Sequence, residues 1–147
     1  MGPLMRAQEA FASMMRQQVA PALRDLGLKG SGQVFSIPSD RYWALIGFQK
    51  SVGSTSEAVK FTVNLQVVSR DDWAKASEAQ RWRGAKPKAN VRPGLPGAWG
   101  ERIGALMPSG YDHWWWVEPD RPTEQVADEV VAALRDHGLP VMKRHMA

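Results

Sequence analysis

The chain has 147 residues, of which 44% are apolar and 23% are charged, a size and balance typical of one globular domain with a buried core. It contains no cysteine, which excludes a disulfide framework, a thiolate zinc site and a cysteine nucleophile. Its three histidines, His113, His137 and His145, lack metal-ligand spacing, so we expect neither a metal nor a cofactor. The net charge of +4 favours an anionic partner without requiring one.

The apolar runs are too short to cross a membrane, because a spanning helix needs roughly 18 to 20 apolar residues. Arg6 and Glu9 interrupt the apolar start, which is unlike a signal peptide. We therefore expect a cytoplasmic protein without membrane attachment, as a monomer or a homodimer. Either Met1 or Met5 fits as the native start.

The first predicted element is an amphipathic helix that ends at Gly27, with Pro21 kinking or restarting it. Its apolar residues recur at spacings of three, four or seven, which is the stripe of one helix face. That stripe consists of Leu4, Phe11, Met15, Val19, Leu23 and Leu26.

From Gln33 the pattern changes to β-branched and aromatic residues, which predicts three antiparallel strands at 33–37, 42–49 and 59–68. The third strand alternates most clearly, with apolar odd-numbered residues from Val59 to Val67. Its even-numbered residues are Lys60, Thr62, Asn64 and Gln66. One face of this strand should therefore be buried and the other polar.

A short helix should follow, capped by Asp71 or Asp72 and running to about Gln80. The next stretch, at about 81–98, is basic and rich in proline and glycine, without an acidic residue. This composition predicts a long surface loop.

Two more strands are predicted at 99–107 and 113–117. The last helix opens after Asp120, and Gly138 followed by Pro140 is expected to stop it. The end of this helix repeats the end of the first one, since residues 22–28 and 133–139 agree at six of seven positions. The flanking segments differ, so a shared helix-stop pattern explains the match better than duplication.

The order of elements predicts an α+β fold over residues 1–147 as a single domain. It should consist of an antiparallel sheet of about five strands, with the N- and C-terminal helices packed on one face. The loop at 81–98 is the natural candidate to fold across the other face.

Short motifs along the chain together resemble a bacterial family known as domain of unknown function 4304. The motifs are Leu26-Gly27-Leu28, Phe48-Gln49-Lys50-Ser51, Phe61-Thr62-Val63-Asn64-Leu65, Arg102-Ile103-Gly104, Asp112-His113-Trp114-Trp115 and His137-Gly138-Leu139-Pro140. The resemblance runs from roughly Val19 to Pro140 and implies an α+β fold, but no mechanism. The positions that it matches are Gln49, Lys50, Asn64, Arg102, His113 and Trp115. The basic loop before Trp99 departs from the family pattern.

A ligand site is predicted on the helix-free sheet face. Strand pairing should bring Gln49 and Arg102 beside Asn64 and Gln66, and an arginine among amides suits a carboxylate, phosphate or peptide group. One tryptophan of 114–116 must face opposite to its neighbours, and with Trp43 and Trp99 it could form an aromatic wall. The predicted ligand-binding residues are Arg102, Asn64, Gln49, Lys50, Trp115 and Trp43; solvated strand residues and core tryptophans are the alternative.

Two other sets of residues suggest different functions. Asp112 and His113 are adjacent and are the candidates for acid-base catalysis, although neighbours on a strand point apart. The loop offers cations and a tryptophan that would suit an anion or a nucleic acid, although no nucleic-acid-binding motif accompanies them. These loop residues are Arg81, Trp82, Arg83, Lys86, Lys88 and Arg92.

The leading hypothesis is therefore a binding module that takes an unknown small molecule or protein partner on the helix-free face. Its size and class are compatible with an accessory or immunity-type protein. An enzyme of unassigned reaction at the same face is the alternative, and we expect the chain not to be an enzyme. An anion or nucleic-acid binder that works through the basic loop is the third hypothesis.

Overall fold

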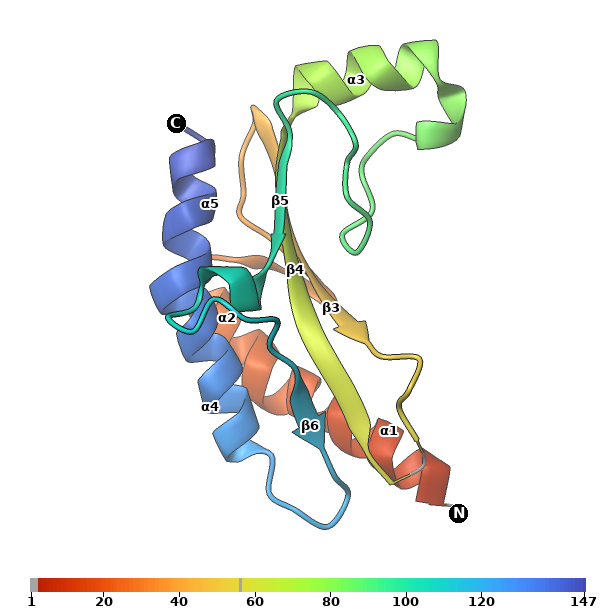
Figure 1. Cartoon of the computed structure of the whole chain (residues 1–147), viewed down its shortest axis with the longest axis vertical. Helices are drawn as coiled ribbons and strands as arrows, with labels where there is room; N and C mark the ends of the chain where they lie inside the picture. The colour runs from red at the N-terminus through yellow and green to blue at the C-terminus, as the bar shows by residue number, and fades with distance from the viewer. Residues whose placement is uncertain (1–2, 56) are drawn as a thin grey trace.

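The computed structural model describes residues 3–55 and 57–147, which form one antiparallel sheet with helices packed against it (Figure 1). Two helical segments flank the strands along the chain. The N-terminal segment consists of α1 (Pro3–Met14), the π-helical turn η1 (Met15–Val19) and α2 (Ala20–Asp25). The C-terminal segment consists of α4 (Glu124–Ala133), the π-helical turn η4 (Leu134–Gly138) and α5 (Leu139–His145). Met1 and the side chains of Leu4 and Met5, on which two predictions depend, lie outside the described part.

The described sheet has six strands, and neighbouring strands pair antiparallel in the order β1-β2-β3-β4-β5, with β6 also paired to β4. The two longest strands, β3 and β4, form its centre. Strands β5 and β6 follow one another along the same edge of β4 (Figure 1). The strands are β1 (Lys29–Ser31), β2 (Val34–Ser36), β3 (Tyr42–Lys50), β4 (Val59–Ser69), β5 (Trp99–Arg102) and β6 (Trp115–Val117).

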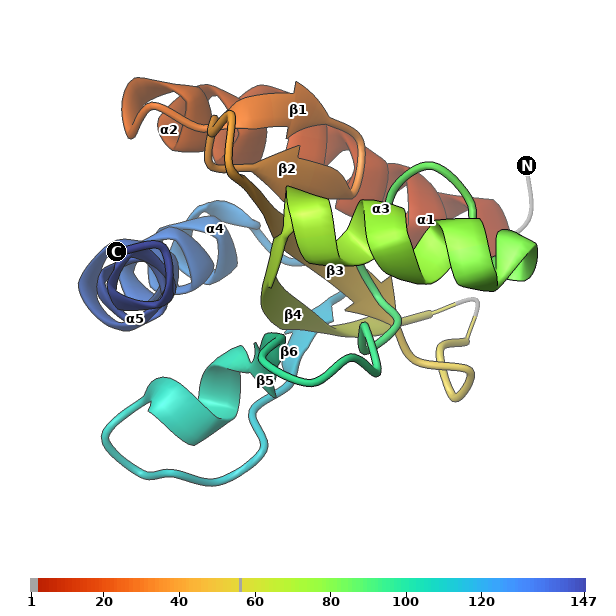
Figure 2. The same ribbon diagram turned by 90° about the horizontal axis from the view of Figure 1, so that it is seen from above.

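Both helical segments cover the same face of the sheet, as predicted. The odd-numbered residues of β4 from Val59 to Val67 are buried there against the stripes of the two segments. Aromatic rings tie the layers together, because Phe61 of β4 contacts Phe11 of α1 at a centroid distance of 5.2 Å and Phe48 of β3 at 6.1 Å. Figure 2 shows α2, α4 and α5 on one side of β3 and β4, with α3 on the other side. This leaves one sheet face free of the terminal helices.

Both helical segments continue through a proline by means of a π-helical turn. Proline lacks a backbone N–H, so an α-helix loses a hydrogen bond at that position. Pro21 follows η1 and lies in the first turn of α2, and Pro140 follows η4 and lies in the first turn of α5. The prediction that Gly138 and Pro140 stop the last helix is therefore wrong, because the helix runs on to His145.

Several strands are shorter than predicted. The stretch at 33–37 is the second arm of a hairpin whose first arm is β1. The strand predicted at 99–107 ends at Arg102, and a 3-10 turn, η3 (Ile103–Leu106), follows. The backbone of Tyr111 and His113 lies so close to Gly104 that a Cβ would not fit, and β6 begins only at Trp115. Propensity alone extends these strands because it does not register the turn around Gly104.

The segment between β4 and β5 begins with helix α3 (Arg70–Ala79), whose N-cap is Ser69 rather than an aspartate. The Ser69 hydroxyl accepts a hydrogen bond of 3.2 Å from the Asp72 amide, while Asp71 and Asp72 lie in the first turn. A 3-10 turn, η2 (Arg81–Arg83), follows, and residues 84–98 then run to β5 without a helix or strand. No helix in the described part of the chain has the length and apolar character to span a bilayer.

Candidate ligand-binding site

The helix-free face of β4 carries the even-numbered polar residues that the alternation predicted. Asn64 is half-buried, but Thr62 and Gln66 are fully buried, at 0% and 2% exposure. The Thr62 hydroxyl donates a hydrogen bond of 2.7 Å to the carbonyl of His113, two residues before β6 begins. These polar residues are therefore covered by other segments of the chain and are not simply solvated.

The basic loop covers this face by docking on Gln66. The Gln66 side-chain Nε2 donates to the carbonyls of Lys88, Ala89 and Val91 at 2.8, 3.1 and 3.0 Å. Three carbonyl partners fix the orientation of the amide, because only its NH₂ group can donate. The opposite atom, Gln66 Oε1, is buried and accepts no hydrogen bond from the described residues. The prediction that the loop folds across this face is confirmed.

A row of amide side chains continues from Gln66 toward β3. The Asn64 Nδ2 donates to Gln49 Oε1 at 2.7 Å and to Asn90 Oδ1 at 3.0 Å. Asn90 lies over Gly47, where a Cβ would collide with its amide group. The glycine in β3 therefore makes room for the loop residue that extends the amide row.

Arg102 of β5 lies beside this row because it pairs with Asn64 in the register of β4 and β5. Its Nη1 donates to Asp112 Oδ2 at 3.0 Å, and the indole N–H of Trp114 donates to the same oxygen at 2.8 Å. The Arg102 guanidinium also lies 5.1 Å from the centroid of the Trp114 ring. The arginine head is thus held between a carboxylate and an aromatic face.

A second arginine-carboxylate pair lies along the same strand, β5. Arg92 of the loop donates from Nη1 to the Gly100 carbonyl at 3.1 Å and from Nη2 to Glu101 Oε1 at 3.4 Å. Arg92 is 74% exposed, so this pair is easily displaced by solvent or ligand.

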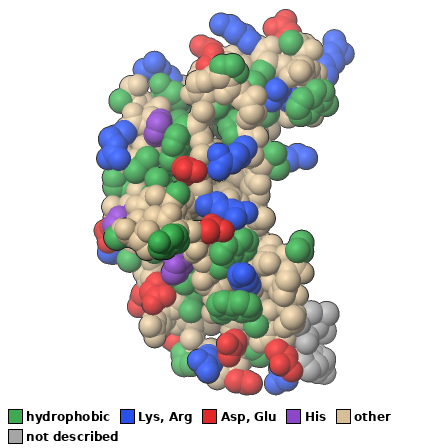
Figure 3. Space-filling model, viewed as in Figure 1, with side chains coloured by type: hydrophobic (Ala, Val, Ile, Leu, Met, Phe, Trp, Pro, Cys, Tyr) green, Lys and Arg blue, Asp and Glu red, His purple; other side chains and the backbone are tan. Residues whose placement is uncertain are grey.

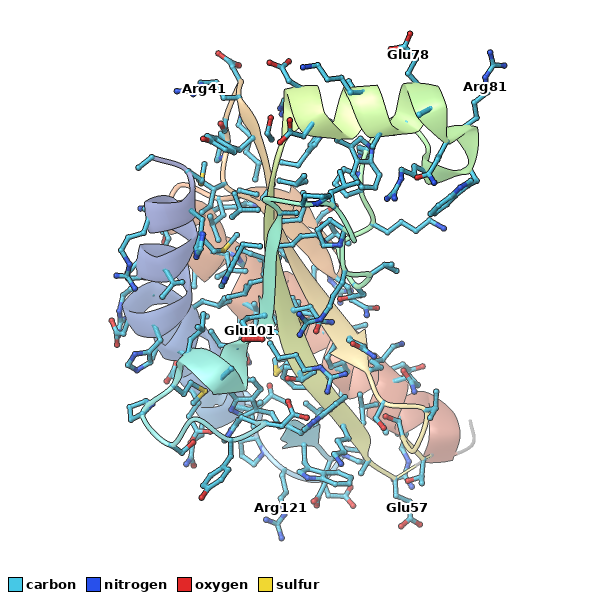
Figure 4. All side chains as sticks on the ribbon, turned by 45° about the horizontal axis from the view of Figure 1, so that its top comes forward. Arg41, Glu57, Glu78, Arg81, Glu101 and Arg121 are labelled. Atoms are coloured by element: carbon cyan, nitrogen blue, oxygen red, sulfur yellow. The ribbon has the colours of Figure 1, made fainter. Side chains whose placement is uncertain are left out.

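Together these residues enclose a pocket of about 510 Å³, within the range of roughly 300 to 1,000 Å³ that small-molecule sites occupy. Basic and acidic side chains lie next to one another in the middle of the face seen in Figure 3, below the part formed by α3. The pocket is lined by Gln49, Asn64, Leu65, Gln66, Ala89, Asn90, Val91, Arg92, Gly100, Glu101, Arg102, Ala105 and Asp112. In Figure 4, Glu101 lies at the centre of the molecule, whereas Arg81 and Arg121 project from its periphery.

The sequence correctly predicted that Gln49, Asn64 and Arg102 lie together. It placed Trp115 wrongly, because Trp115 pairs with Phe61 in the sheet register and shares its inward face. The Trp115 side chain is 4% exposed and stacks on Phe61 at a centroid distance of 5.7 Å in the core. Of the three consecutive tryptophans, Trp114 and Trp116 lie on the helix-free face, with the Lys60 ammonium between them at 5.2 and 5.5 Å from their ring centroids.

Two other predicted residues lie outside this pocket. Lys50 is on the helix-covered side at the end of β3, where its Nζ donates to Gln8 of α1 at 3.0 Å. Trp43 is on the correct face but near the opposite end of β3, under the guanidinium of Arg70 at 3.8 Å from the ring centroid. Neither side chain lines the pocket, and Trp99 stacks on His145 of α5 on the helix-covered side.

The pair Asp112 and His113 does not form an acid-base couple in this structure. The Asp112 carboxylate is held by Arg102 and Trp114, whereas the His113 ring packs edge-on against Trp115 at 4.4 Å. The two side chains therefore have different neighbours, as their adjacency on an extended segment implies.

The six residues of the basic loop do not form one surface. Arg83 turns inward and donates to Gln80 and to the Pro93 carbonyl, while Arg92 belongs to the pocket. Arg81, Lys86 and Lys88 are exposed, and Trp82, 77% exposed, has the Arg83 guanidinium 4.7 Å from its ring centroid.

Asn90 and Glu101 were not expected in the site from the sequence, and Gln66 was placed on this face but not among the ligand-binding residues. Gln66 could have been included, since it shares the alternation of Asn64. Asn90 has no such signal, because its position depends on how the loop crosses the sheet. Glu101 pairs with Leu65, so the alternation assigns it to the buried side rather than to this face. Among the described residues there is no group of three or more His, Asp or Glu side chains suited to a metal ion.

Fold and site together define a small α+β protein with a helix-covered antiparallel sheet and a polar pocket under a docked loop on the other face. The chain belongs to the family described as domain of unknown function (DUF4304), which matches residues 19–144. No curated protein matches the chain. No solved structure matches it either.

Proposed function

We propose that this protein is a non-catalytic binding module that takes a small polar ligand with an acidic group in the pocket on the helix-free face. The observation that carries the proposal is the meeting of Arg102, Arg92 and a row of side-chain amides around one pocket of about 510 Å³. A cytoplasmic location is part of the proposal, and cell fractionation tests it.

The acidic group of the ligand would bind Arg102. A guanidinium has five N–H donors in a planar fork. Arg102 uses one of them for its hydrogen bond to Asp112. A ligand carboxylate or phosphate can use further donors or replace Asp112, which is 49% exposed. Because the Trp114 ring lies beside the guanidinium, Arg102 is already oriented before the ligand arrives.

The amide row supports a ligand that also donates hydrogen bonds. Asn64 uses its NH₂ group for Gln49 and Asn90, which leaves its carbonyl oxygen as an acceptor. Gln66 Oε1 is a buried acceptor without a protein donor in the described chain. A buried acceptor without a donor costs about 1 to 3 kcal/mol, but this atom is itself covered, so the Asn64 carbonyl oxygen is the acceptor offered to a ligand that donates. An acid that carries an amide or amine, such as an amino acid or a peptide end, meets both requirements.

The enzyme alternative has less support. It needs Asp112 to orient or activate His113, but that carboxylate is engaged by Arg102 and Trp114. A binding role requires no such rearrangement.

A protein partner on the same face, as expected of an accessory or immunity-type protein, is the second candidate. It is favoured by Trp116, which is 51% exposed on this face, since exposed aromatic rings are common anchors of protein interfaces. In that case no small molecule should stabilise the protein, and Trp116→Ala should weaken the complex.

The test is a thermal-shift screen with amino acids, N-acetylated amino acids, small acids, nucleotides and short oligonucleotides, followed by calorimetry on each hit. Arg102→Ala should weaken binding of an acidic hit by about 1.5 kcal/mol, the lower end for a charged hydrogen bond because Arg102 is partly exposed. Asp112→Asn removes the competing carboxylate and should strengthen binding of the acidic hit.

The matched control is Arg121→Ala, because Arg121 forms a comparable surface pair with Glu118 at 3.2 Å and lies outside the pocket. If Arg121→Ala weakens binding as much as Arg102→Ala, the ligand responds to net charge and the pocket is not its site. If oligonucleotides alone stabilise the protein and Lys86→Gln with Lys88→Gln abolishes this, the basic loop is the functional surface.

A further inference from the structure

A second hollow, of about 500 Å³, lies on the helix-covered side of the sheet, between the N-terminal helical segment and the hairpin of β1 and β2. Figure 2 shows this hairpin beside α1 and α2. The hollow shares no lining residue with the polar pocket. It is lined by Gln8, Phe11, Ala12, Met15, Arg16, Ala20, Arg24, Ser31, Gly32, Gln33 and Lys50.

The floor of this hollow is apolar. Phe11, Met15 and Ala20 are only 2 to 3% exposed and belong to the same helical stripe that fills the core. The hairpin strands β1 and β2 have three residues each, too short to cover the whole length of the helical segment. These side chains form an apolar base, and Ala12, which is exposed and also lines the hollow, adds apolar surface on which a hydrocarbon chain can be removed from water.

The rim of the hollow is basic. Its charged residues are Arg16, Arg24 and Lys50, and no acidic residue lines it in the described chain. Arg24 is held by a hydrogen bond of 3.0 Å from Nη2 to the Gly30 carbonyl. Lys50 is held by Gln8, with its ammonium 5.7 Å from the centroid of the Phe11 ring. Two of the three cations are thus positioned beside the apolar floor.

We propose that this hollow binds a free amphipathic acid, with its hydrocarbon chain on Phe11 and Met15 and its carboxylate among Arg16, Arg24 and Lys50. The argument is charge complementarity next to an apolar floor, since an apolar ligand without a negative charge would leave the three cations unmatched. Lys50, expected from the sequence at the polar pocket, takes part in this second site instead.

A free acid fits better than an anionic membrane surface. The apolar groups lie at the bottom of a hollow, which a single chain can enter and a flat bilayer cannot. Glu9 and Asp25 are exposed on the same helical segment, and their charges would oppose an anionic surface.

The test is calorimetric titration of the full chain with hexanoate, octanoate and decanoate at concentrations below micelle formation. Affinity should rise about fourfold with each added methylene, from the transfer free energy of a CH₂ group. Decanol, which has the same chain without the charge, should bind more weakly than decanoate.

The variants separate the floor from the rim. Ala12→Trp, at an exposed position that lines the hollow, should fill it and abolish binding. Arg16→Gln should lower the affinity for decanoate by up to about fivefold, which is the upper end for a partly exposed ion pair. Arg16 has no hydrogen bond within the described chain, so its replacement leaves the fold intact. Arg144→Gln on α5 removes the same charge from an exposed position outside the hollow and is the matched control.

The proposal is overturned if decanoate shows no saturable binding, or if folded Ala12→Trp binds as well as the natural chain. If Arg16→Gln and Arg144→Gln weaken decanoate binding equally, the effect comes from net charge alone, and the proposal is overturned too. Binding to anionic phosphatidylglycerol vesicles without binding to monomeric decanoate would make the hollow a membrane contact. None of these results affects the polar pocket, whose ligand is tested with separate variants.

Discussion

Residues 22–28 and 133–139 have the same amino acid at six of seven positions but take different structures. In the segment 22–28, α2 ends and Gly27 adopts φ +90°. The Leu28 amide donates a hydrogen bond of 3.1 Å to the Leu23 carbonyl there. In the segment 133–139, the chain continues through η4 into α5, and Gly138 has the helical φ of −76°. Nearly the same residues therefore end one helix and lie within the other.

The surroundings of the two glycines explain the difference. A Cβ on Gly27 would have no heavy atom within 4 Å, whereas a Cβ on Gly138 would lie 3.0 Å from Ile103 and 3.2 Å from Leu65. Gly27 is needed for its backbone conformation. Gly138 is needed because the helix approaches the sheet closely at that point.

The shared arginine and aspartate differ as well. Arg24 donates to the Gly30 carbonyl, but Arg135 donates to both oxygens of Asp136 at 2.8 and 3.0 Å. The hydrogen bond from Arg135 lowers the pKa of Asp136 below its usual value. Local sequence permits more than one structure here, and packing against the rest of the chain selects between them.

The largest effect is expected from Gly138→Asn. It should lower the free energy of unfolding by about 3 kcal/mol, because it both overpacks the contact with Ile103 and buries an amide without partners. Chemical denaturation measures this loss.

Gly138→Ala is its control, since it adds the Cβ without the amide. It should cost clearly less, because alanine regains about 1 kcal/mol of helix propensity over glycine. If asparagine is tolerated as well as alanine at this position, the glycine is not required by close packing.

The fold was predictable because its signals are periodic. The alternation in β4 identified the buried face, and the stripes of the terminal segments identified the helices that cover it. The early end of β5 at Arg102 and the continuation through Pro140 were not predictable, because each depends on a contact with a residue distant in sequence.

The same distinction applies to the site. Gln49, Asn64 and Arg102 were predicted together because strand order and alternation determine their face. Trp115 was placed wrongly because three consecutive tryptophans have no apolar-polar alternation to indicate which one points inward. Its pairing with Phe61 decides this, and the register of β6 on β4 is not encoded within β6 itself.

A smaller effect is expected at the first of the two segments. Gly27→Ala should lower the free energy of unfolding by about 1 kcal/mol, because φ +90° is unfavourable for a residue with a Cβ. Gly27→Asn should cost less than alanine, since asparagine tolerates this conformation. The preference for alanine or asparagine is thus expected to reverse between positions 27 and 138. The same order at both positions would show that the two glycines serve one role, contrary to the structure.

The smallest effect is expected where the two segments differ, at Leu26 and His137. If that difference decided between stopping and continuing, His137→Leu would convert the second segment toward a helix end and release α5. We expect instead a change within about 0.5 kcal/mol in the free energy of unfolding, as for a surface substitution that removes no packing or capping contact. Hydrogen exchange of the α5 amides measures this directly. Unchanged protection there, together with a large loss in Gly138→Asn, would locate the decision in the contact between the helix and the sheet rather than in the local sequence.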